Sequence, residues 1–189
     1  MKSLIQFIKE AQRDDLIPIN IIIGRFQPFT RGHEECANYA FDQSRLQSVL
    51  CVIDTKKADE KHPFLTKDIE DVLDTIVKES ENIIGWVRVS NADIVKNAEI
   101  LRANGFEPMS WSCGSDRINN YTKMSKNYSE KAGLDPDFEM FEIPRTDEDI
   151  SATKVRKSLI EDDKKTFEKL VPKYLHKYFS KLKTLIEQI

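Results

Sequence analysis

An early segment of the chain, GRFQPFTRGH, combines residue types that suit the binding of a phosphate group. Its first residue, Gly24, permits a tight turn or a close approach of the backbone to a phosphate. Gly32 and His33 open a predicted helix, where free backbone N–H groups and the helix dipole favour an anion. His33 can donate a hydrogen bond to a phosphoryl oxygen, and Arg25 and Arg31 raise the local positive potential. An ordinary strand-to-helix turn with a capping or packed histidine is the alternative, and spacing alone favours neither.

A second segment, ISATKVR, lies toward the other end of the chain. Ser151 and Thr153 place hydroxyl groups beside a predicted helix start, and Arg156 projects from the first turns toward the same end. This combination suits the outer phosphates of a nucleoside triphosphate. In isolation, a plain N-capped helix with a solvated arginine is the better interpretation. Paired with the first segment, in this order, the functional interpretation is favoured.

Five short runs of β-branched and other apolar residues predict buried strands that would position these segments. The segments 32–43, 66–79 and 94–103 have helical patterns, with Thr66 as the expected N-cap of the second. The region from about 151 is predicted to be helical with one break, at Pro172. The expected strands are Ile19–Ile23, Ser48–Ile53, Trp86–Val89, Met109–Cys113 and Phe138–Ile143.

Strands that alternate with helices predict an α/β fold, in which a parallel sheet is covered by helices on both faces. Such sheets bind ligands at the carboxyl ends of their strands, near the point where the strand order reverses. The loops after the first, fourth and fifth strands are therefore the expected locations of the chemistry.

Composition indicates a globular protein. The 189 residues are 40% hydrophobic and 32% charged, which suits one folded domain. The net charge of −3 argues against a chain-wide grip on nucleic acid, and the lysines of the C-terminal region predict a solvated face. No apolar run reaches membrane length, and Cys36, Cys51 and Cys113 lack the spacing of a zinc site or a disulfide framework. A reducing cytosol, and hence a cytoplasmic protein, is expected.

Both segments resemble motifs of the nucleotidyltransferase superfamily. GRFQPFTRGH is similar to that superfamily's GRFQPFHxGH segment, and its (H/T)xGH motif reads Thr30-Arg31-Gly32-His33 here. The second segment resembles the ISSTxVR motif. The residues Gly24–Phe29 look most like those of nicotinamide-nucleotide adenylyltransferases, which usually have His at the position of Thr30. Threonine occurs there in pantetheine-phosphate adenylyltransferases.

Further segments fit the resemblance in part. His62-Pro63-Phe64 resembles the NPF stretch of the nicotinamide-nucleotide enzymes, with His62 in place of Asn, and Ile69 stands where Arg is expected. The segment 114–117 lies where the family contacts nucleotide or the second substrate, although its polar residues could equally cap a short helix. Two tryptophans near strand ends could stack on a flat ring, although the core is their commoner location. The implied acceptor-binding residues are Asp116, Arg117, Trp86 and Trp111.

The resemblance implies a single Rossmann-like domain over 1–189, with an amino-terminal helix (1–16), a core (19–159) of about five strands and C-terminal helices (160–189). It implies that a phosphate monoester attacks the α-phosphorus of ATP, with Mg²⁺ present, and releases pyrophosphate; nicotinamide mononucleotide as the acceptor would give NAD. The implied catalytic residues are His33, Thr30 and Arg156. The implied ATP-binding residues are Gly24, Arg25, Phe26, Gly32, His33, Ser151, Thr153 and Arg156.

Two alternatives stay open. Another nucleotidyltransferase, with a different acceptor or with CTP, would share both motifs. A nucleotide-sensing or partner-binding protein without turnover is the rival from a different class, and Thr30 and Ile69 favour it. The expected partners are ATP and a small phosphate-bearing acceptor, with no nucleic acid, no membrane and no protein-held metal. Formation of a homo-oligomer is left open.

Overall fold

Among the residues that the structure, a computed structural model, describes (15–115, 117–135, 137–143 and 150–189), five strands form one parallel sheet. The sheet has the order β3-β2-β1-β4-β5, and every pairing is parallel. This confirms the predicted Rossmann-like α/β class. The strands are β1 (Ile17–Gly24), β2 (Ser48–Ile53), β3 (Ile83–Val89), β4 (Phe106–Gly114) and β5 (Glu139–Ile143).

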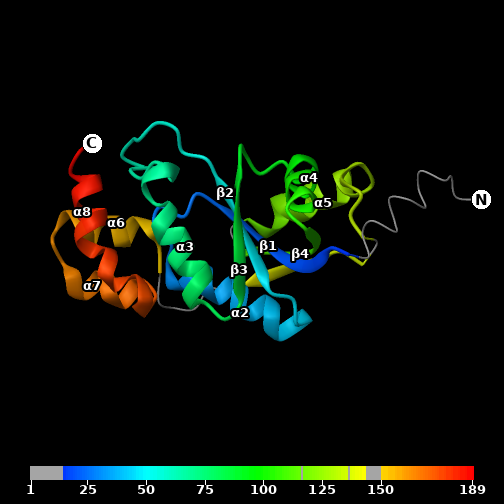
Figure 1. Cartoon of the computed structure of the whole chain (residues 1–189), viewed down its shortest axis with the longest axis horizontal. Coiled ribbons are helices and arrows are strands. Elements are labelled where there is room, and N and C mark those ends of the chain that lie inside the picture. Colours follow the sequence, from blue (N-terminus) through cyan, green and yellow to red (C-terminus); the bar gives the residue numbers. More distant parts are fainter. Residues whose placement is uncertain (1–14, 116, 136, 144–149) are drawn as a thin grey trace, which may run out of the picture.

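Helices cover both faces of the sheet, because alternate residues of the central strands face two separate apolar cores. In β1, Ile22 joins one core, whereas Ile21 and Ile23 join the other. The first core also takes side chains from α2 (Arg31–Ser44), α3 (Glu70–Glu79) and α6 (Ala152–Ile160). The second takes them from α4 (Ile94–Ala103) and α5 (Ile118–Ala132), which lie on the other side of the sheet in Figure 1.

A buried polar network ties the three central strands together. Asn20 of β1 donates to Ser48 of β2 and to Ser112 of β4, at 2.9 Å each, and Ser110 of β4 donates back to Asn20 at 3.0 Å. All four side chains are fully buried. Because a register slip would leave these groups unpaired, the network favours this one register.

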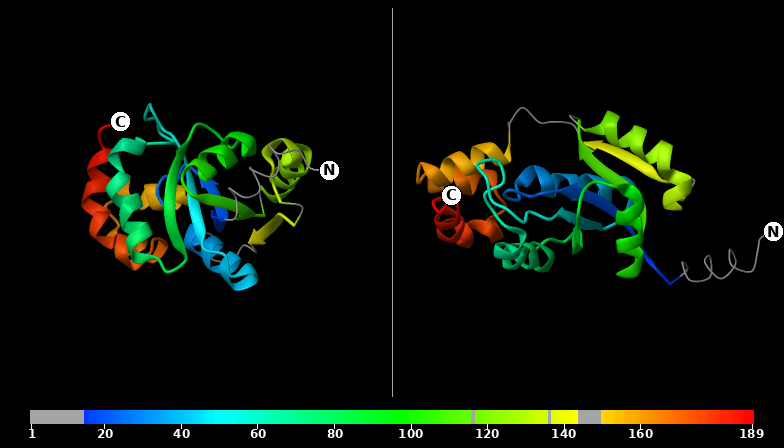
Figure 2. Two further views of the ribbon diagram at one scale, coloured as in Figure 1. Left: turned by 45° about the vertical axis from the view of Figure 1, so that its right-hand side comes forward. Right: turned by 90° about the horizontal axis from the view of Figure 1, so that it is seen from above.

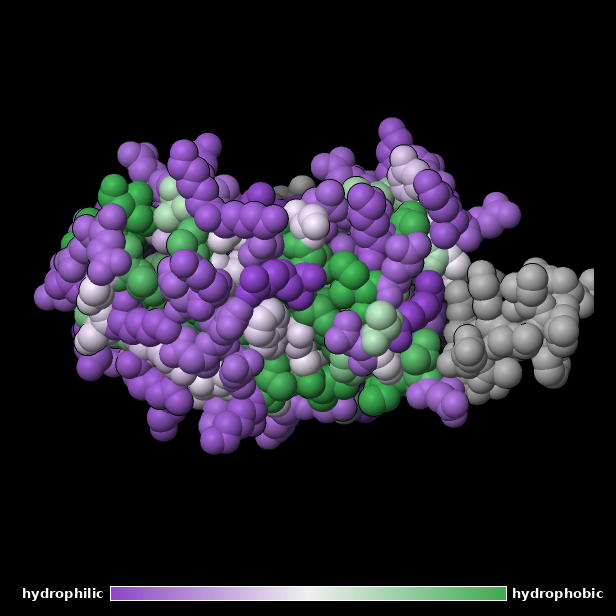
Figure 3. Space-filling view, turned by 45° about the horizontal axis from the view of Figure 1, so that its top comes forward, coloured by the Kyte–Doolittle hydropathy of each residue, from purple (hydrophilic) through white to green (hydrophobic). Residues whose placement is uncertain are grey.

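The C-terminal extension, residues 164–186, packs on the first core at the end of the molecule opposite α4 and α5 (Figures 1 and 2). It comprises α7 (Lys164–Leu170), the 3₁₀ segment η2 (Lys173–Tyr178) and α8 (Phe179–Ile186). Phe167, Leu175, Phe179 and Leu182 bury their side chains in the first core, where the extension packs against α3 and α6. No described helix is both long and apolar enough to cross a membrane. Most side chains on the face in Figure 3 are hydrophilic, with apolar ones showing in its middle.

Several predicted elements need correction. Within 150–189 the C-terminal region is interrupted twice, after Ile160 as well as near Pro172, so the single predicted break is wrong. Thr66 is not the N-cap of α3 but the first residue of a separate 3₁₀ turn, η1 (Thr66–Asp68), and its Oγ1 accepts from the Thr55 N–H at 2.8 Å. The sequence analysis anticipated at most a short helix where α5 has 15 residues. Most of the predicted amino-terminal helix lies outside the described residues.

Candidate functional site

The strand order reverses at β1, which lies between β2 and β4. In an open parallel sheet, the crevice outside the carboxyl ends of the strands at such a point is the usual ligand site. Segment 25–30, which follows β1, and the start of α5, which follows β4, border this crevice. The first predicted motif therefore begins where the topology expects a ligand.

The buried side chain of Gln27 joins the loop after β1 to the segment after β2. Its Oε1 accepts from the Phe64 N–H at 2.9 Å, and its Nε2 donates to the Phe64 carbonyl at 2.7 Å. Nε2 also donates to Thr55 Oγ1 at 3.3 Å. Leaving a buried polar group without its partner costs about 1–3 kcal/mol, so this pairing holds the two loops together. No role for Gln27 is evident from the sequence alone.

Arg156 brings the second motif onto the first. Its Nη1 donates to the Gln27 carbonyl at 2.7 Å, although 129 positions separate the two residues in sequence, and its Nη2 donates to Thr153 Oγ1 at 3.1 Å. Partial burial lowers the pKa of the Arg156 guanidinium, and the Asp59 carboxylate acts in the opposite direction. The half-buried guanidinium thus lies at the first loop.

The start of α6 borders the first turn of α2. Ser151 is the N-cap of α6, and its Oγ accepts from the Lys154 N–H at 3.3 Å. A Cβ built on Gly32 would lie 4.0 Å from the Ile150 carbonyl oxygen, which places the two helix starts side by side. Helix N-termini present unpaired N–H groups and partial positive charge, so the pair forms a rim that suits an anion.

The imidazole of His33 is held in one orientation. Its ring centroid lies 5.1 Å from that of Phe26 and 5.3 Å from that of Phe29. Nδ1 accepts a hydrogen bond from the Thr30 backbone N–H at 3.0 Å, and Thr30 Oγ1 lies 3.1 Å from the same nitrogen. Because Nδ1 is an acceptor, a neutral imidazole carries its proton on Nε2. His33 can therefore offer one oriented hydrogen-bond donor.

His33 is neutral at pH 7. Burial is the main cause that lowers its pKa from 6.5 to about 4, and the positive charge of Arg117 lowers it further. Arg117 stands at the start of α5, where its Nη1 donates to the Tyr121 hydroxyl at 3.2 Å. One predicted acceptor residue therefore acts electrostatically on the motif histidine.

The remaining predicted ATP-binding residues of the first loop differ in exposure. Phe26 is buried with a φ of 49°, and a Cβ on Gly24 would lie 3.3 Å from its ring. The missing Cβ of Gly24 thus makes room for Phe26, while the left-handed backbone is at Phe26 itself. Arg25 is exposed, whereas Arg31 donates from Nε to the Val171 carbonyl at 3.2 Å.

The structure separates Trp86 from the other predicted acceptor residues that it describes. Trp86 belongs to β3 and donates from Nε1 to Asp74 of α3 at 2.9 Å. Trp111 belongs to β4, is 0% exposed and stacks on Tyr121 with centroids 4.1 Å apart. The two rings pack on opposite faces of the sheet, each against one of the two apolar cores. Asp116 lies outside the described residues.

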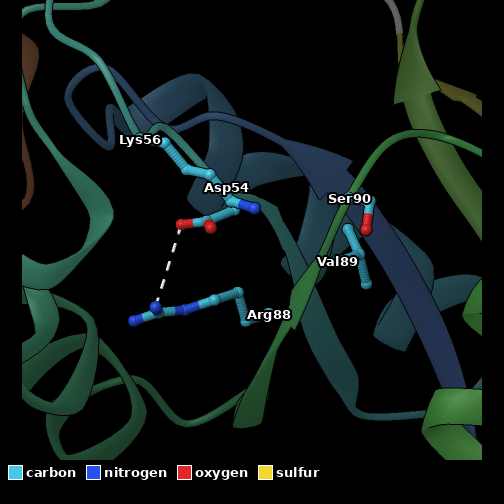
Figure 4. Close-up of a pocket in the computed structure, with 5 residues that line it drawn as sticks. All are labelled: Asp54, Lys56, Arg88, Val89 and Ser90. Carbon is cyan, nitrogen blue, oxygen red and sulfur yellow. Dashed lines mark ion pairs between the residues drawn. The ribbon is translucent and has the colours of Figure 1, made fainter.

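A cleft of about 470 Å³ lies at the carboxyl ends of β2 and β3. Arg88 extends across it toward Asp54, with Nη1 at 3.9 Å from Oδ1 (Figure 4). Arg88 also pairs with Glu70. A cavity of about 230 Å³ shares three of its lining residues and adds Thr55, Leu65 and Lys67. The cleft is lined by Asp54, Lys56, Arg88, Val89 and Ser90.

The sequence motifs point only to the loops after the first, fourth and fifth strands, so they do not predict this cleft. Asp54 and Lys56 come directly after β2, and Ser90 directly after β3. The carboxyl ends of parallel strands all lie along one edge, so the same rule points to these positions. Thr55 both lines the smaller cavity and accepts from Gln27, which makes the cleft continuous with the first loop.

The described residues include no group of three or more His, Cys, Asp or Glu side chains that could hold a metal ion. Mg²⁺ bound with a nucleotide takes most of its ligands from phosphate oxygens and water.

Comparison with solved structures shows a shared fold. The bifunctional NMN adenylyltransferase/ADP ribose pyrophosphatase of Francisella tularensis, solved with AMP and a manganese ion, aligns with a TM-score of 0.58 at 16% identity. The alignment covers 91% of this chain but 52% of that one, so this chain spans about half of its length. The nicotinic acid mononucleotide adenylyltransferase of Plasmodium falciparum, complexed with APC, aligns with a TM-score of 0.51 at 18% identity, over 85% and 95% of the two chains. No family model and no curated protein matches the sequence.

The low pKa of His33 makes the stability of the fold depend on pH. The unfolded chain takes up this proton near pH 6.5 and the folded chain near pH 4, so the unfolded state binds more protons between these values. Acidification across this window therefore destabilises the fold, by at most about 3 kcal/mol from this group. We expect the difference in unfolding free energy between wild type and His33→Gln, measured with urea, to change in favour of the variant as the pH falls from 6.5 to 4. A difference that stays constant across the window would contradict the assignment.

Proposed function

We propose that this chain is an adenylyltransferase that transfers the adenylyl group of ATP to a small phosphate monoester. The observation that carries the proposal is the 2.7 Å hydrogen bond from Arg156 to the Gln27 carbonyl, which joins the two motifs. A guanidinium, two helix starts and a neutral imidazole then border one crevice. The shared fold of two adenylyltransferases supports the same reaction class.

In the proposed complex the triphosphate lies between the starts of α2 and α6. His33 donates from Nε2 to an oxygen of the α-phosphate, while Arg156 and the start of α6 bind the β- and γ-phosphates. Negative charge builds on the departing pyrophosphate, so these contacts strengthen in the transition state. Ser151 acts as the cap of α6 and Thr153 orients Arg156, in agreement with the contacts that both make.

We place the acceptor in the cleft beside β2 and β3. Lys56, Lys67 and Arg88 offer cations to a phosphate group, and Asp54 can accept hydrogen bonds from hydroxyl groups. The volume of about 470 Å³ is in the range of small-molecule sites. Because the cleft adjoins the first loop through Thr55, a phosphate bound there would lie next to the proposed triphosphate site.

The chemistry requires no general base. An oxygen of the acceptor phosphate forms a bond to the α-phosphorus, and the bond from the α-phosphorus to the oxygen that bridges it to the β-phosphate breaks. A phosphate monoester is already ionised at neutral pH, so no proton has to be removed. Catalysis then depends on positioning and on neutralisation of charge, which suits a rim of donors and cations.

Nicotinamide mononucleotide is the acceptor that we propose, with NAD as the product. The resemblance of Gly24–Phe29 supports it, and both structural neighbours are named as mononucleotide adenylyltransferases. Thr30 is compatible, because its backbone N–H donates to His33 Nδ1, a contact that does not depend on the side chain at this position. Ile69 is buried in the core, and we assign the role of the arginine expected there to Arg88 of the cleft.

Incubation with Mg²⁺, ATP and a panel of acceptors tests this function. We expect pyrophosphate release with nicotinamide mononucleotide and the formation of NAD. Much faster reaction with phosphopantetheine or flavin mononucleotide would overturn the proposed acceptor but keep the reaction class. ATP binding without pyrophosphate release for any acceptor would favour the nucleotide-sensing alternative.

Substitution of His33 tests its role as a donor to the α-phosphate. His33→Ala, checked by circular dichroism to be folded, should lower kcat about 10²–10³-fold, the usual cost of losing one donor to a reacting phosphoryl or oxyanion group.

Substitutions of Arg156 test the orientation of ATP. Arg156→Ala should raise KM for ATP and lower kcat while KM for the acceptor changes little, because the guanidinium faces the leaving group. Arg156→Lys should restore part of the loss, since an ammonium keeps the charge but lacks the planar fork. Steady-state constants for both substrates decide the point. If Arg156→Ala damages acceptor binding and leaves the ATP constants unchanged, the substrates are placed the wrong way round.

A further inference from the structure

The C-terminal extension makes two hydrogen bonds to the first turn of α2, which carries His33. Arg31 Nε donates to the Val171 carbonyl at 3.2 Å, and the Tyr174 hydroxyl donates to Glu34 Oε1 at 2.7 Å. Arg31 and Glu34 are three residues apart on α2, and Val171 and Tyr174 are three residues apart on the extension. We call these two contacts together the clasp. His33 lies between the two gripped positions of α2.

The two clasp residues of the extension, Val171 and Tyr174, are held by burial and packing. Val171 is 1% exposed and its N–H donates to the Phe167 carbonyl at 3.1 Å, which closes the end of α7. Tyr174 is half-buried and packs against the first core. Burial, followed by the hydrogen bond to Glu34, raises the pKa of the Tyr174 phenol, so its hydroxyl stays protonated as a donor. The clasp can therefore restrain α2 from a fixed support.

We propose that Tyr174 is a positioning residue for His33: its hydrogen bond to Glu34 holds the first turn of α2 so that the imidazole keeps its place at the reacting phosphate. The role of His33 at a phosphate rests on the proposed function. The restraint itself does not, because it is a property of the chain without substrate. Misplacement of a reacting group by about 1 Å can cost about a hundredfold in rate, so a restraint of this kind can matter for turnover.

The same extension supplies a matched control. Tyr178 also uses its hydroxyl, which lies 2.7 Å from Thr75 Oγ1 and donates to the Asp71 carbonyl at 2.9 Å. Both partners belong to α3, not to α2. Tyr178→Phe thus removes an equivalent hydroxyl from the extension without opening the clasp.

Titration of His33 by NMR, without substrate, measures the restraint. The chain has three histidines, and His33→Gln identifies the signal. In wild type we expect a midpoint near 4, because partial burial disfavours the charged form of the imidazole. Tyr174→Phe should let water reach the ring and raise the midpoint by about one unit or more toward 6.5, whereas Tyr178→Phe should leave it near 4. Arg117, the charged group that acts on His33, is unchanged in both variants.

Substitutions of Glu34 separate the hydrogen bond from the charge. Glu34→Gln keeps an acceptor for Tyr174 and should leave the midpoint near the wild-type value. Glu34→Ala should raise the His33 midpoint as Tyr174→Phe does. Combining Glu34→Ala with Tyr174→Phe should raise the midpoint no further than either substitution alone. In the turnover assay, Tyr174→Phe should lower kcat roughly ten- to hundredfold with little change in KM for ATP.

An unchanged His33 midpoint in Tyr174→Phe, or an equal rise in Tyr178→Phe, would overturn the positioning role and leave the transferase proposal untouched. If the titrations are as expected but the wild-type protein shows no turnover, the transferase proposal would be overturned and the restraint on His33 would stand.

Discussion

The buried amide of Gln27 is the constraint on which the site depends. Its side chain must be paired once it leaves water, and the segment after β2 supplies both partners at Phe64. The loop after β1 is thereby fixed, and its carbonyl at Gln27 becomes the acceptor that captures Arg156. Three segments that are far apart in the sequence meet at one residue, and the two motifs share one rim because of it.

This arrangement gathers hydrogen-bond donors at one site and assigns no side chain as a general base. His33 is neutral because burial disfavours its charged form, and its tautomer is set by a backbone N–H. Positive charge is contributed by Arg156, Arg117 and the partial charges of the two helix starts. An anionic nucleophile suits this combination, because the donors and cations neutralise the negative charge of the phosphates and no proton has to be removed from the nucleophile. The geometry and the proposed chemistry therefore agree.

The sequence predicts the parts of this site that local patterns specify. The runs at 19–23 and 48–53 are apolar on both faces, so β1 and β2 are recognisable, and the two motifs mark the helix starts beside them. Pairing across the sheet is not local. The partners of Gln27, the clasp at Tyr174 and the cleft at Arg88 depend on how distant segments pack, and no periodicity encodes them. The length of α5 was missed because its buried face is sparse, with Tyr121, Ser125 and Ala132 as its buried residues.

A crystal structure of the protein with Mg²⁺ and a non-hydrolysable ATP analogue would show where the triphosphate lies. We expect the α-phosphate within hydrogen-bond distance of His33 Nε2, and the β- and γ-phosphates at Arg156 and the start of α6. A triphosphate bound in the cleft between Asp54 and Arg88, or turned away from Arg156, would contradict this expectation.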